Sequence, residues 1–406
     1  MSISRKGVIF PDYRAEAESL RAQLVAWRRD LHRHPELSFR ETRTATLVAR
    51  TLGELGYEVR TGVGHTGVVA LLQGGRPGPS VLLRADMDAL PIQELSEAPY
   101  ASQTPGVMHA CGHDGHVAVG LGAATLLARH AAELPGRVIF LFQPAEEGDG
   151  GARAMIAEGA LADPTPDAAF ALHLWNQIPL GRVCAQAGPM MAASDVLRIT
   201  VRGRGGHGAL PHETVDAIAV TAQVLSALQT IVSRNVDPQE TAVLTIGTVH
   251  GGTAFNVIAE TVELQGTVRT FSPAVRETVL ARLRVLLDGV TAGMGARYDL
   301  TVQGVAPTVV NDPGASEIAR AAAVQVVGNT AVAWCPPLMI SEDFSEYQKH
   351  VPGCFMLLGA GNPELAFNAP HHNPRFDFDE RALPICAALL ATVATRFMLE
   401  RVTSDE

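Results

Sequence analysis

The chain of 406 residues lacks the features that mark several large classes of protein. Its five cysteines are odd in number and form no C-x-x-C pair, so we expect no disulfide scaffold and a reducing compartment, the cytoplasm. No run of about 18 uncharged apolar residues occurs, so no membrane span is expected. The N-terminal stretch MSISRKGVIFPDYRAEAESL also has no apolar core long enough for a signal peptide.

Positive charge is scarce as well. The 32 Lys and Arg residues are outnumbered by 42 Asp and Glu residues, which gives a formal net charge of −10. A protein of this sign is not expected to bind nucleic acid or an anionic membrane surface. We therefore expect a small-molecule substrate, and an anionic substrate would need Arg or His placed close to it.

The composition is that of a folded protein, and the length suggests two domains. Apolar runs that alternate with helical periodicity predict an α/β sheet covered on both faces. The predicted helices span residues 15–32, 41–55 and 117–132, and the predicted strands span 67–72, 80–83, 138–142, 168–172 and 354–361.

A different pattern occupies the middle of the chain. Its order is β-α-β-β-α-β, which is the ferredoxin-like split unit. The strands are predicted over 195–201, 241–250, 260–271 and 298–305, and the helices over 215–233 and 274–287. The sequence thus predicts a discontinuous α/β domain over residues 1–187 and 303–406, with residues 188–302 inserted.

Polar clusters lie just after, or between, the predicted strands and helices of the α/β domain, and in open sheets of this kind ligands bind beyond the carboxyl ends of the strands. They are RADMDALP (84–91), HACGHDGH (109–116), QPAEEGDGGA (143–152), HLW (173–175) and APHHNPRFDFDE (369–380). Thiolate, imidazole and carboxylate donors suit Zn, Mn, Co or Ni. Five candidate ligands exceed the needs of one tetrahedral ion, which favours two divalent ions with a shared ligand. These candidates are Cys111, His113, Glu147, His173 and His372.

Two further carboxylates have candidate roles beside the metal. Glu146 would face the attacking water as general base while its neighbour Glu147 binds metal. Asp86 would accept a hydrogen bond from a ligand histidine.

Simpler interpretations exist for each cluster taken alone. Cys111 could be a nucleophile activated by His113, although such pairs usually come from distant parts of a chain. Asp114 could be the N-cap of the following helix, and His173 a packed strand residue. The sequence GRGGHG (203–208) fits a dinucleotide-binding pattern, but no acidic residue follows at the required position, so we interpret it as a tight loop that places His207. The metal interpretation rests on the conjunction of the clusters.

The motifs RADMDALP, HACGHDGH, QPAEEGDGGA, SEDFSEY and HHNPRFDFDE, in this order, resemble the hippurate hydrolase and auxin-conjugate (IAA-amino acid) amidohydrolase family. This family lies in the aminoacylase–carboxypeptidase clan of di-metal peptidases, and the resemblance covers residues 25–395. It implies a two-domain α/β fold: a mixed-sheet catalytic domain and an inserted ferredoxin-like lid through which the chain forms a homodimer or higher homo-oligomer.

The resemblance also implies roles for residues. The five candidate ligands match ligands of the family, with Cys111 bridging, and Glu146 matches the general base. The wider clan has a metal-binding histidine where this chain has Arg84. Of the adjacent His371 and His372, the second directly precedes Asn-Pro, as in the family pattern, so we predict His372 as ligand and keep His371 as the alternative.

The predicted lid contributes His207, Asn256 and Arg269, which resemble substrate-facing residues of the family. The activity implied is metal-dependent hydrolysis of N-acyl amino acids, such as hippurate or N-acetyl amino acids, to a carboxylate and a free amino acid. The alternatives are a metallo-dipeptidase or carboxypeptidase acting on free peptides, and a metal-loaded binding protein without turnover. The intact Glu146 disfavours the last, because binding alone needs no general base.

Overall fold

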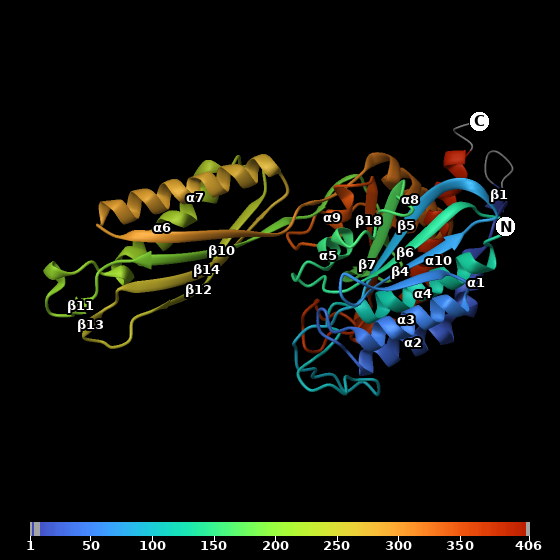
Figure 1. Ribbon diagram of the computed structural model, residues 1–406, viewed down its shortest axis with the longest axis horizontal. Coiled ribbons are helices and arrows are strands. Elements are labelled where there is room, and N and C mark those ends of the chain that lie inside the picture. The colour runs from blue at the N-terminus through green and yellow to red at the C-terminus, as the bar shows by residue number, and fades with distance from the viewer. Residues whose placement is uncertain (1, 4–8, 403–406) are drawn as a thin grey trace. The chain divides into compact units, whose positions relative to one another are not determined.

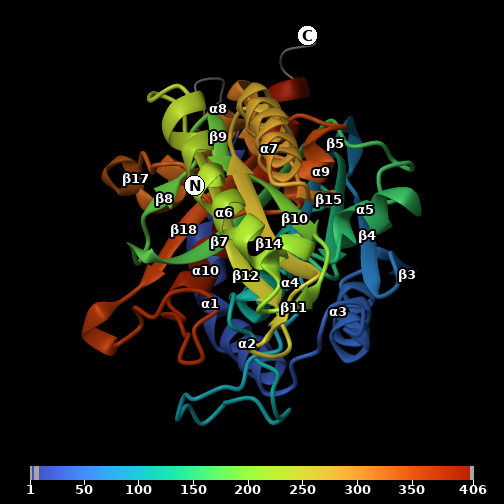
Figure 2. The ribbon, with the colours of Figure 1, turned by 90° about the vertical axis from the view of Figure 1, so that its left-hand side faces the viewer.

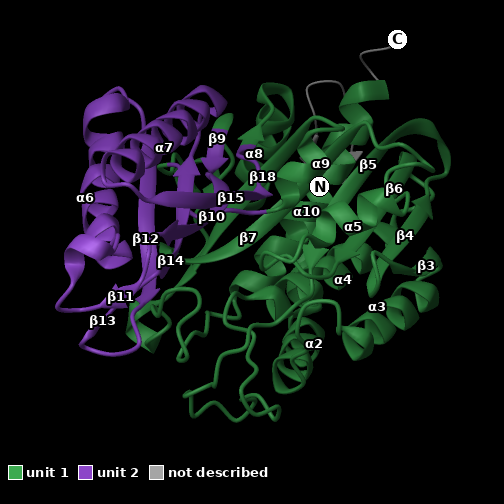
Figure 3. Ribbon diagram, turned by 60° about the vertical axis from the view of Figure 1, so that its left-hand side comes forward, with its two compact units in different colours: residues 1–188, 310–336, 343–406 green, residues 189–309, 337–342 purple. Residues whose placement is uncertain are grey.

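The computed structural model describes residues 2–3 and 9–402, which fold into two compact units (Figure 3). The first contains residues 1–188, 310–336 and 343–406, and the second contains residues 189–309 and 337–342. The second unit therefore extends beyond the predicted boundary at 302, because its last strand continues to Ala306. It also includes the short segment 337–342, which the sequence analysis placed in the α/β domain.

The first unit is built on an eight-stranded mixed sheet with the order β17-β8-β18-β7-β5-β6-β4-β3 (Figure 1). Strands β6, β5, β7 and β18 are parallel, so their carboxyl ends lie at one edge. The strands are β3 (Glu58–Val63), β4 (Gly67–Gln73), β5 (Arg76–Asp86), β6 (Pro135–Gln143), β7 (Ala168–Pro179), β8 (Val183–Cys184), β17 (Val332–Ala333) and β18 (Gly353–Gly361). A separate pair is formed by β1 (Ser2–Ile3) and β2 (Ile9–Phe10), and β9 (Gly188–Met191) and β16 (Val309–Asn311) lie where the chain passes between the units.

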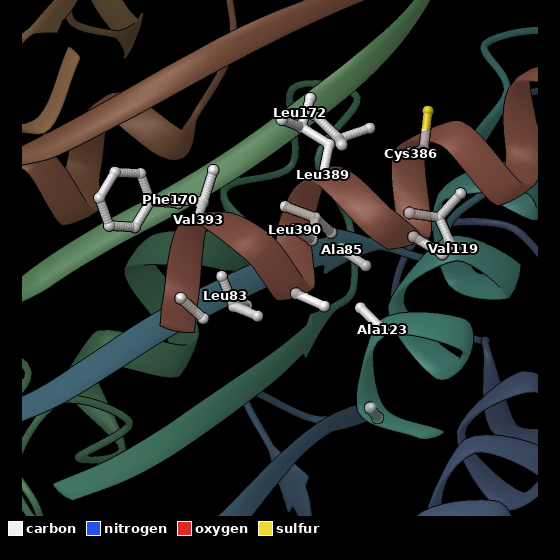
Figure 4. Close-up of a cluster of buried hydrophobic side chains, with 14 of the residues drawn as sticks. Leu83, Ala85, Val119, Ala123, Phe170, Leu172, Cys386, Leu389, Leu390 and Val393 are labelled. Carbon is white, nitrogen blue, oxygen red and sulfur yellow. The ribbon is translucent and has the colours of Figure 1, made fainter. Parts of the chain in front are cut away.

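Helix α10 is the centre of the core of this unit. Its apolar side chains pack against β5, β7 and α4 (Figure 4). The helices are α1 (Tyr13–Ser19), α2 (Arg21–Arg33), α3 (Thr42–Glu54), α4 (His113–Arg129), α5 (Gly151–Ala157), α8 (Pro313–Val327), α9 (Phe344–Gln348) and α10 (Ala382–Val402). Helix α10 is long and apolar enough to cross a membrane, but 94% of its apolar window is buried inside the protein, as in a core helix.

The second unit is a four-stranded antiparallel sheet, β12-β14-β10-β15, against which α6 and α7 pack side by side (Figures 1 and 2). Helix α6 is also long and apolar enough to cross a membrane, and one apolar face of it is buried in this unit. The elements are β10 (Ala193–Arg202), β11 (Gly206–His207), α6 (Ala217–Asn235), β12 (Ala242–Gly251), β13 (Val257–Ile258), β14 (Thr261–Thr270), α7 (Pro273–Gly293) and β15 (Arg297–Ala306). Without the small β11–β13 pair, this is the predicted β-α-β-β-α-β order.

Two sequence expectations need correction. Helix α4 begins at His113 rather than at Val117, because Gly112 adopts a left-handed conformation (φ 91°) that turns the chain directly into the helix. One disulfide, which the cysteine count did not foresee, joins Cys184 to Cys335. These residues lie 151 positions apart in the sequence, and the parallel pairing of β8 with β17 brings their segments together.

Candidate metal centre

Five donor side chains from four segments of the chain meet near the carboxyl ends of β5 and β6. The ligand atoms of Cys111, His113 and His173 lie within 4.8 Å of one another, and so do those of Cys111, Glu147 and His372. The thiol of Cys111 thus belongs to both groups. The carboxylate of Glu146 forms a further group with His113 and Glu147 at the same spacing. The structure therefore brings together all five predicted ligands and the predicted general base.

The donors fit divalent metal ions. Among the described residues, His113 Nε2 is buried without a hydrogen-bond partner, and the buried Glu147 Oε1 makes no hydrogen bond although His372 Nε2 lies 3.3 Å from it. A buried polar atom left unpaired costs about 1–3 kcal/mol, so two such atoms aimed into one cluster indicate a missing partner. A cation would pair with both. One thiol, three imidazoles and one carboxylate form a donor set suited to transition metals rather than to Ca²⁺ or Mg²⁺.

Close packing holds the turn between Cys111 and His113 in place. A Cβ atom at Gly115 would lie 2.6 Å from Phe378 Cζ and 2.7 Å from Leu174 Cδ1, so only glycine lets the first turn of α4 approach β7. The backbone N–H of His372 donates to the Ala110 carbonyl at 2.8 Å. This bond ties the C-terminal histidine pair to the Cys111 segment.

The loop that carries Glu146 and Glu147 follows the end of β6. Ala145 has a positive φ of 53°, and its N–H donates to the buried Glu41 carboxylate at 3.0 Å. The N–H of Glu147 donates to Asp88 Oδ2 at 3.2 Å. Buried carboxylates thus fix the backbone of this loop, and the two glutamate side chains remain directed to the cluster.

Asp86 was predicted to accept a hydrogen bond from a ligand histidine, but the histidine that it contacts is His116, which is not a predicted ligand. Its Oδ1 lies 2.6 Å from Nδ1 of His116 and 3.8 Å from Nε2 of His113. The residue that accepts from Nδ1 of His113 is Asp88, through its backbone oxygen at 2.9 Å and its Oδ1 at 3.2 Å. Asp88 was not among the predicted site residues, and His116 had no predicted role. A signal was present, since aspartates at alternate positions after a strand point to the same side.

The main chain of Leu174 organises three histidines. The carbonyl of Leu174 accepts from Nδ1 of His173 at 2.7 Å and from Nε2 of His371 at 2.9 Å. The N–H of Leu174 donates to Nε2 of His116 at 3.0 Å. These bonds assign the His173 proton to Nδ1. The Nε2 atom of His173, which lies 3.6 Å from the Cys111 sulfur, is therefore unprotonated and has a lone pair that can bind a metal.

The adjacent histidines His371 and His372 have different environments. The ring of His371 stacks on Trp175 at a centroid distance of 4.1 Å, and its Nε2–H is used by Leu174. Burial lowers the pKa of His371 to about 3. Nε2 of His372 instead lies 3.3 Å from Glu147 Oε1, and its side chain is 52% exposed. The geometry favours His372 as the metal ligand.

The electrostatics of the cluster disfavour a nucleophilic cysteine. Burial, and then the negative charges of Glu147 and Glu146, hold the pKa of the Cys111 thiol well above its usual value. A nucleophilic cysteine requires neighbours that lower its pKa. Burial alone would lower the pKa of His113, but Asp86 and Asp88 outweigh it and raise the pKa to about 10. The site gathers negative charge that a cation would balance.

Arg84, which stands where the clan has a histidine, is buried and paired. Its Nη1 contacts Asp86, its Nε donates to Gln143 at 2.9 Å, and its Nη2 donates to Asp343 at 3.0 Å. Asp343 also accepts from the Ala152 N–H at 3.0 Å. Burial raises the pKa of Asp343 to about 6, although Arg84 opposes this. Arg84 therefore supports the ends of β5 and β6 rather than the cluster itself.

The predicted N-cap role of Asp114 is also wrong, because Gly112 occupies the N-cap position. The Asp114 carboxylate accepts from Arg28 Nε at 2.8 Å and lies 2.8 Å from His32 Nδ1. Arg28 is fully buried and also donates to Asp377 at 2.7 Å. This buried ion-pair network joins α2 to the first turn of α4 behind the donor cluster.

The other predicted residues lie in the second unit. His207 and Asn256 are neighbours on the exposed β11–β13 segment, where the Gly208 N–H donates to the Asn256 carbonyl at 2.8 Å. Arg269 pairs with Ser194 at the start of β10, whereas His207 follows the end of that strand. The structure therefore separates Arg269 from His207 within this unit. Arg269 donates to hydroxyls of Thr267 and Ser341 and has no carboxylate partner among the described residues.

A sheet of this kind with thiol, imidazole and carboxylate donors beside a further carboxylate defines a metal-dependent hydrolase. The model of "Peptidase family M20/M25/M40" matches residues 82–396, and the chain belongs to this family. The family resemblance inferred from the motifs is thus confirmed.

Relatives of known name are similar over nearly the whole chain. N-acetylcysteine deacetylase of Bacillus subtilis (strain 168) is 39% identical, over 93% of this chain and 97% of the relative. IAA-amino acid hydrolase ILR1-like 4 of Arabidopsis thaliana is 40% identical, over 93% of this chain and 86% of the relative. The crystal structure of the Bacillus subtilis YXEP protein, a dinuclear metal-binding peptidase from the M20 family, is 36% identical, covers 94% of this chain and 99% of its own, and has a TM-score of 0.82. Together with the donor cluster, these findings support a site for two divalent metal ions.

Proposed function

We propose that this protein hydrolyses the amide bond of N-acyl amino acids to a carboxylate and a free amino acid. The observation that carries the proposal is the Glu146 carboxylate beside two donor groups that share Cys111. The similarity to an N-acetylcysteine deacetylase and to an IAA-amino acid hydrolase supports N-acyl amino acids as the substrate class.

The residues that would hold two divalent ions are Cys111, His113, Glu147, His173 and His372, with Cys111 shared. When bound, Mn, Zn, Co or Ni ions polarise an amide carbonyl and lower the pKa of water. Glu146 takes a proton from the attacking water and later delivers it to the leaving amine. We assign metal binding to the neighbouring Glu147, because its carboxylate lies in the donor group with Cys111 and His372, to which Glu146 does not belong.

Substrate binding is proposed for residues of the second unit. Arg269 is half-buried, has only hydroxyl partners among the described residues, and carries a guanidinium that can bind the substrate carboxylate with two hydrogen bonds. His207 would stabilise the oxyanion that forms on the carbonyl, a task worth about 10²–10³ in rate per donor. Asn256, its neighbour, would contact the substrate.

We also propose that the protein is a cytoplasmic homodimer or higher homo-oligomer. The second unit exposes apolar side chains around His207, with Phe255 completely exposed, Val257 47% exposed and Leu210 42% exposed. Such a group of exposed apolar residues is suited to a contact between copies of the chain. Light scattering after size-exclusion chromatography tests this: a dimer or larger species is expected, and a monomer at all concentrations would contradict it.

The substrate experiment measures release of free amino acid by mass spectrometry. The protein, loaded in turn with Mn, Zn, Co or Ni, is offered N-acetyl, N-benzoyl and N-indolylacetyl amino acids, together with free dipeptides. We expect cleavage of acyl amino acids and no cleavage of dipeptides. Cleavage of free peptides alone would contradict the proposal and identify a metallo-dipeptidase or carboxypeptidase.

A further inference from the structure

Asp88 connects three separate parts of the site, although neither the family motifs nor the proposed mechanism assigns it a task. It lies two residues beyond the end of β5, and only 1% of its surface is exposed. We propose that Asp88 is a positioning residue that aligns the His113 ring and the Glu146–Glu147 loop with each other. The inference rests on the proposed function for the roles of these residues.

The first contact is with His113. Its Nδ1 atom lies 2.9 Å from the backbone oxygen of Asp88 and 3.2 Å from Oδ1 of the same residue. Both atoms are acceptors, so Nδ1 carries the proton. The other nitrogen, Nε2, is left without a partner and is directed into the donor cluster. Asp88 thereby fixes both the tautomer and the orientation of the ring, as carboxylate partners of ligand histidines do.

The second contact is with the glutamate loop. Oδ2 of Asp88 accepts from the Glu147 N–H at 3.2 Å, and the Glu146 N–H also bonds to this carboxylate. A third donor, the Ser38 hydroxyl, lies 2.9 Å from Oδ2. One oxygen of the carboxylate, Oδ1, therefore faces the ligand ring, and the other, Oδ2, faces the backbone of Glu147 and the Ser38 hydroxyl.

Asp86, the last residue of β5, and Asp88 each pair with one histidine in the first turn of α4. Asp88 is hydrogen-bonded to His113, which belongs to the donor cluster. Asp86 is hydrogen-bonded to His116, whose other ring nitrogen accepts from the Leu174 N–H. This division leaves Asp88 as the carboxylate in direct contact with both a donor histidine and the glutamate loop. All donors around Asp88 point at an ionised acceptor, so an amide in its place would turn an N–H₂ group toward a donor.

The experiment compares Asp88→Asn with Ser38→Ala. The control removes one hydrogen bond from the same carboxylate oxygen but leaves both contacts to His113. Zinc affinity is measured by competition with a chelator, and the unfolding of the metal-free proteins is measured in urea. We expect Asp88→Asn to bind zinc about 10–100-fold more weakly, the usual effect of losing a partner of a ligand histidine. Ser38→Ala should lose much less affinity.

A purely structural role would weaken the metal-free fold without this selective loss of zinc. At saturating zinc, kcat of Asp88→Asn should fall while KM changes little, because Asp88 does not touch the substrate. Zinc affinity needs no substrate, so it tests Asp88 even if N-acyl amino acids prove inert. Equal zinc affinity in folded Asp88→Asn and wild type would overturn the inference.

A measurement on the wild-type protein guards against failure of the variant to fold. In zinc-loaded protein labelled with ¹⁵N-histidine, the ring nitrogen shifts identify which nitrogen of His113 carries the proton. Protonated Nδ1 and zinc on Nε2 are expected. Zinc on Nδ1 would exclude the contact with Asp88 and refute the proposal without any substitution.

Discussion

The different environments of the adjacent histidines predict opposite effects for two substitutions: His371→Ala should mainly lower the stability of the metal-free protein, and His372→Ala should mainly reduce metal binding. His371 is buried, donates one hydrogen bond to the Leu174 carbonyl and stacks on Trp175. The hydrogen bond contributes about 0.5–1.5 kcal/mol and the stack a similar amount, so His371→Ala should lower the free energy of unfolding of the metal-free protein by about 1–3 kcal/mol. His372 is half-exposed with one contact to Glu147, which is worth at most about 1 kcal/mol.

The order reverses for metal binding. His372→Ala removes a proposed ligand, so one of the two ions should be lost after dialysis. His371→Ala only loosens the peptide group that orients His173, so both ions should remain, with affinity reduced by about 10–100-fold. Metal content is measured by mass spectrometry and stability by urea unfolding of the metal-free proteins. Full metal content in His372→Ala, together with loss of an ion in His371→Ala, would refute the assignment.

Three further predictions concern other parts of the first unit. Glu146→Gln should lower kcat by about 10²–10⁴-fold at unchanged metal content, because it removes the proton acceptor but no ligand; retained turnover would remove Glu146 from the mechanism. Arg28→Met should lower the free energy of unfolding by about 3–5 kcal/mol in urea, because it leaves the buried Asp114 carboxylate without its cation; a loss below about 1 kcal/mol would contradict this. Folding raises the pKa of the Asp343 carboxyl from 3.8 to about 6, so the folded state binds the proton more tightly than the unfolded state does. This difference stabilises the folded state fully below pH 3.8, and the stabilisation is lost as the pH rises through 6. Asp343→Asn should therefore flatten the fall in unfolding free energy across this window, and an unchanged slope in urea titrations would show that Asp343 does not cause it.

The donor cluster could be predicted because each of its segments follows an apolar strand of the first unit or precedes a helix in a short polar stretch. Parallel strands β5 and β6 end at one edge of the sheet, which places Glu147 there, whereas His173 lies inside β7, level with the end of β5. The start of α4 could not be predicted as well. The polar residues in its first turn are typical of a loop, so the sequence predicts none of this turn as helix. In the structure these residues have buried partners: His113 contacts Asp88, and Asp114 pairs with Arg28.

Hydrogen-bond partners were the part least accessible to sequence. Asp86 and Asp88 are equivalent by alternation, and only the position of α4 decides that Asp88 meets His113 while Asp86 meets His116. The pairing of Cys184 with Cys335 depends in the same way on which short strands are neighbours. Such choices follow from the packing of elements distant in the chain, which a single sequence does not specify.

The organisation of three histidines by the main chain of Leu174 has a consequence for sequence variation. The atoms that fix these rings belong to the main chain, and a side-chain substitution at position 174 leaves both its N–H and its carbonyl in place. Proline is the exception, because it would remove the N–H that His116 accepts. The alignment of this part of the site therefore depends on the position of the Leu174 backbone, which is set by the close packing of the buried Leu174 side chain against Gly115.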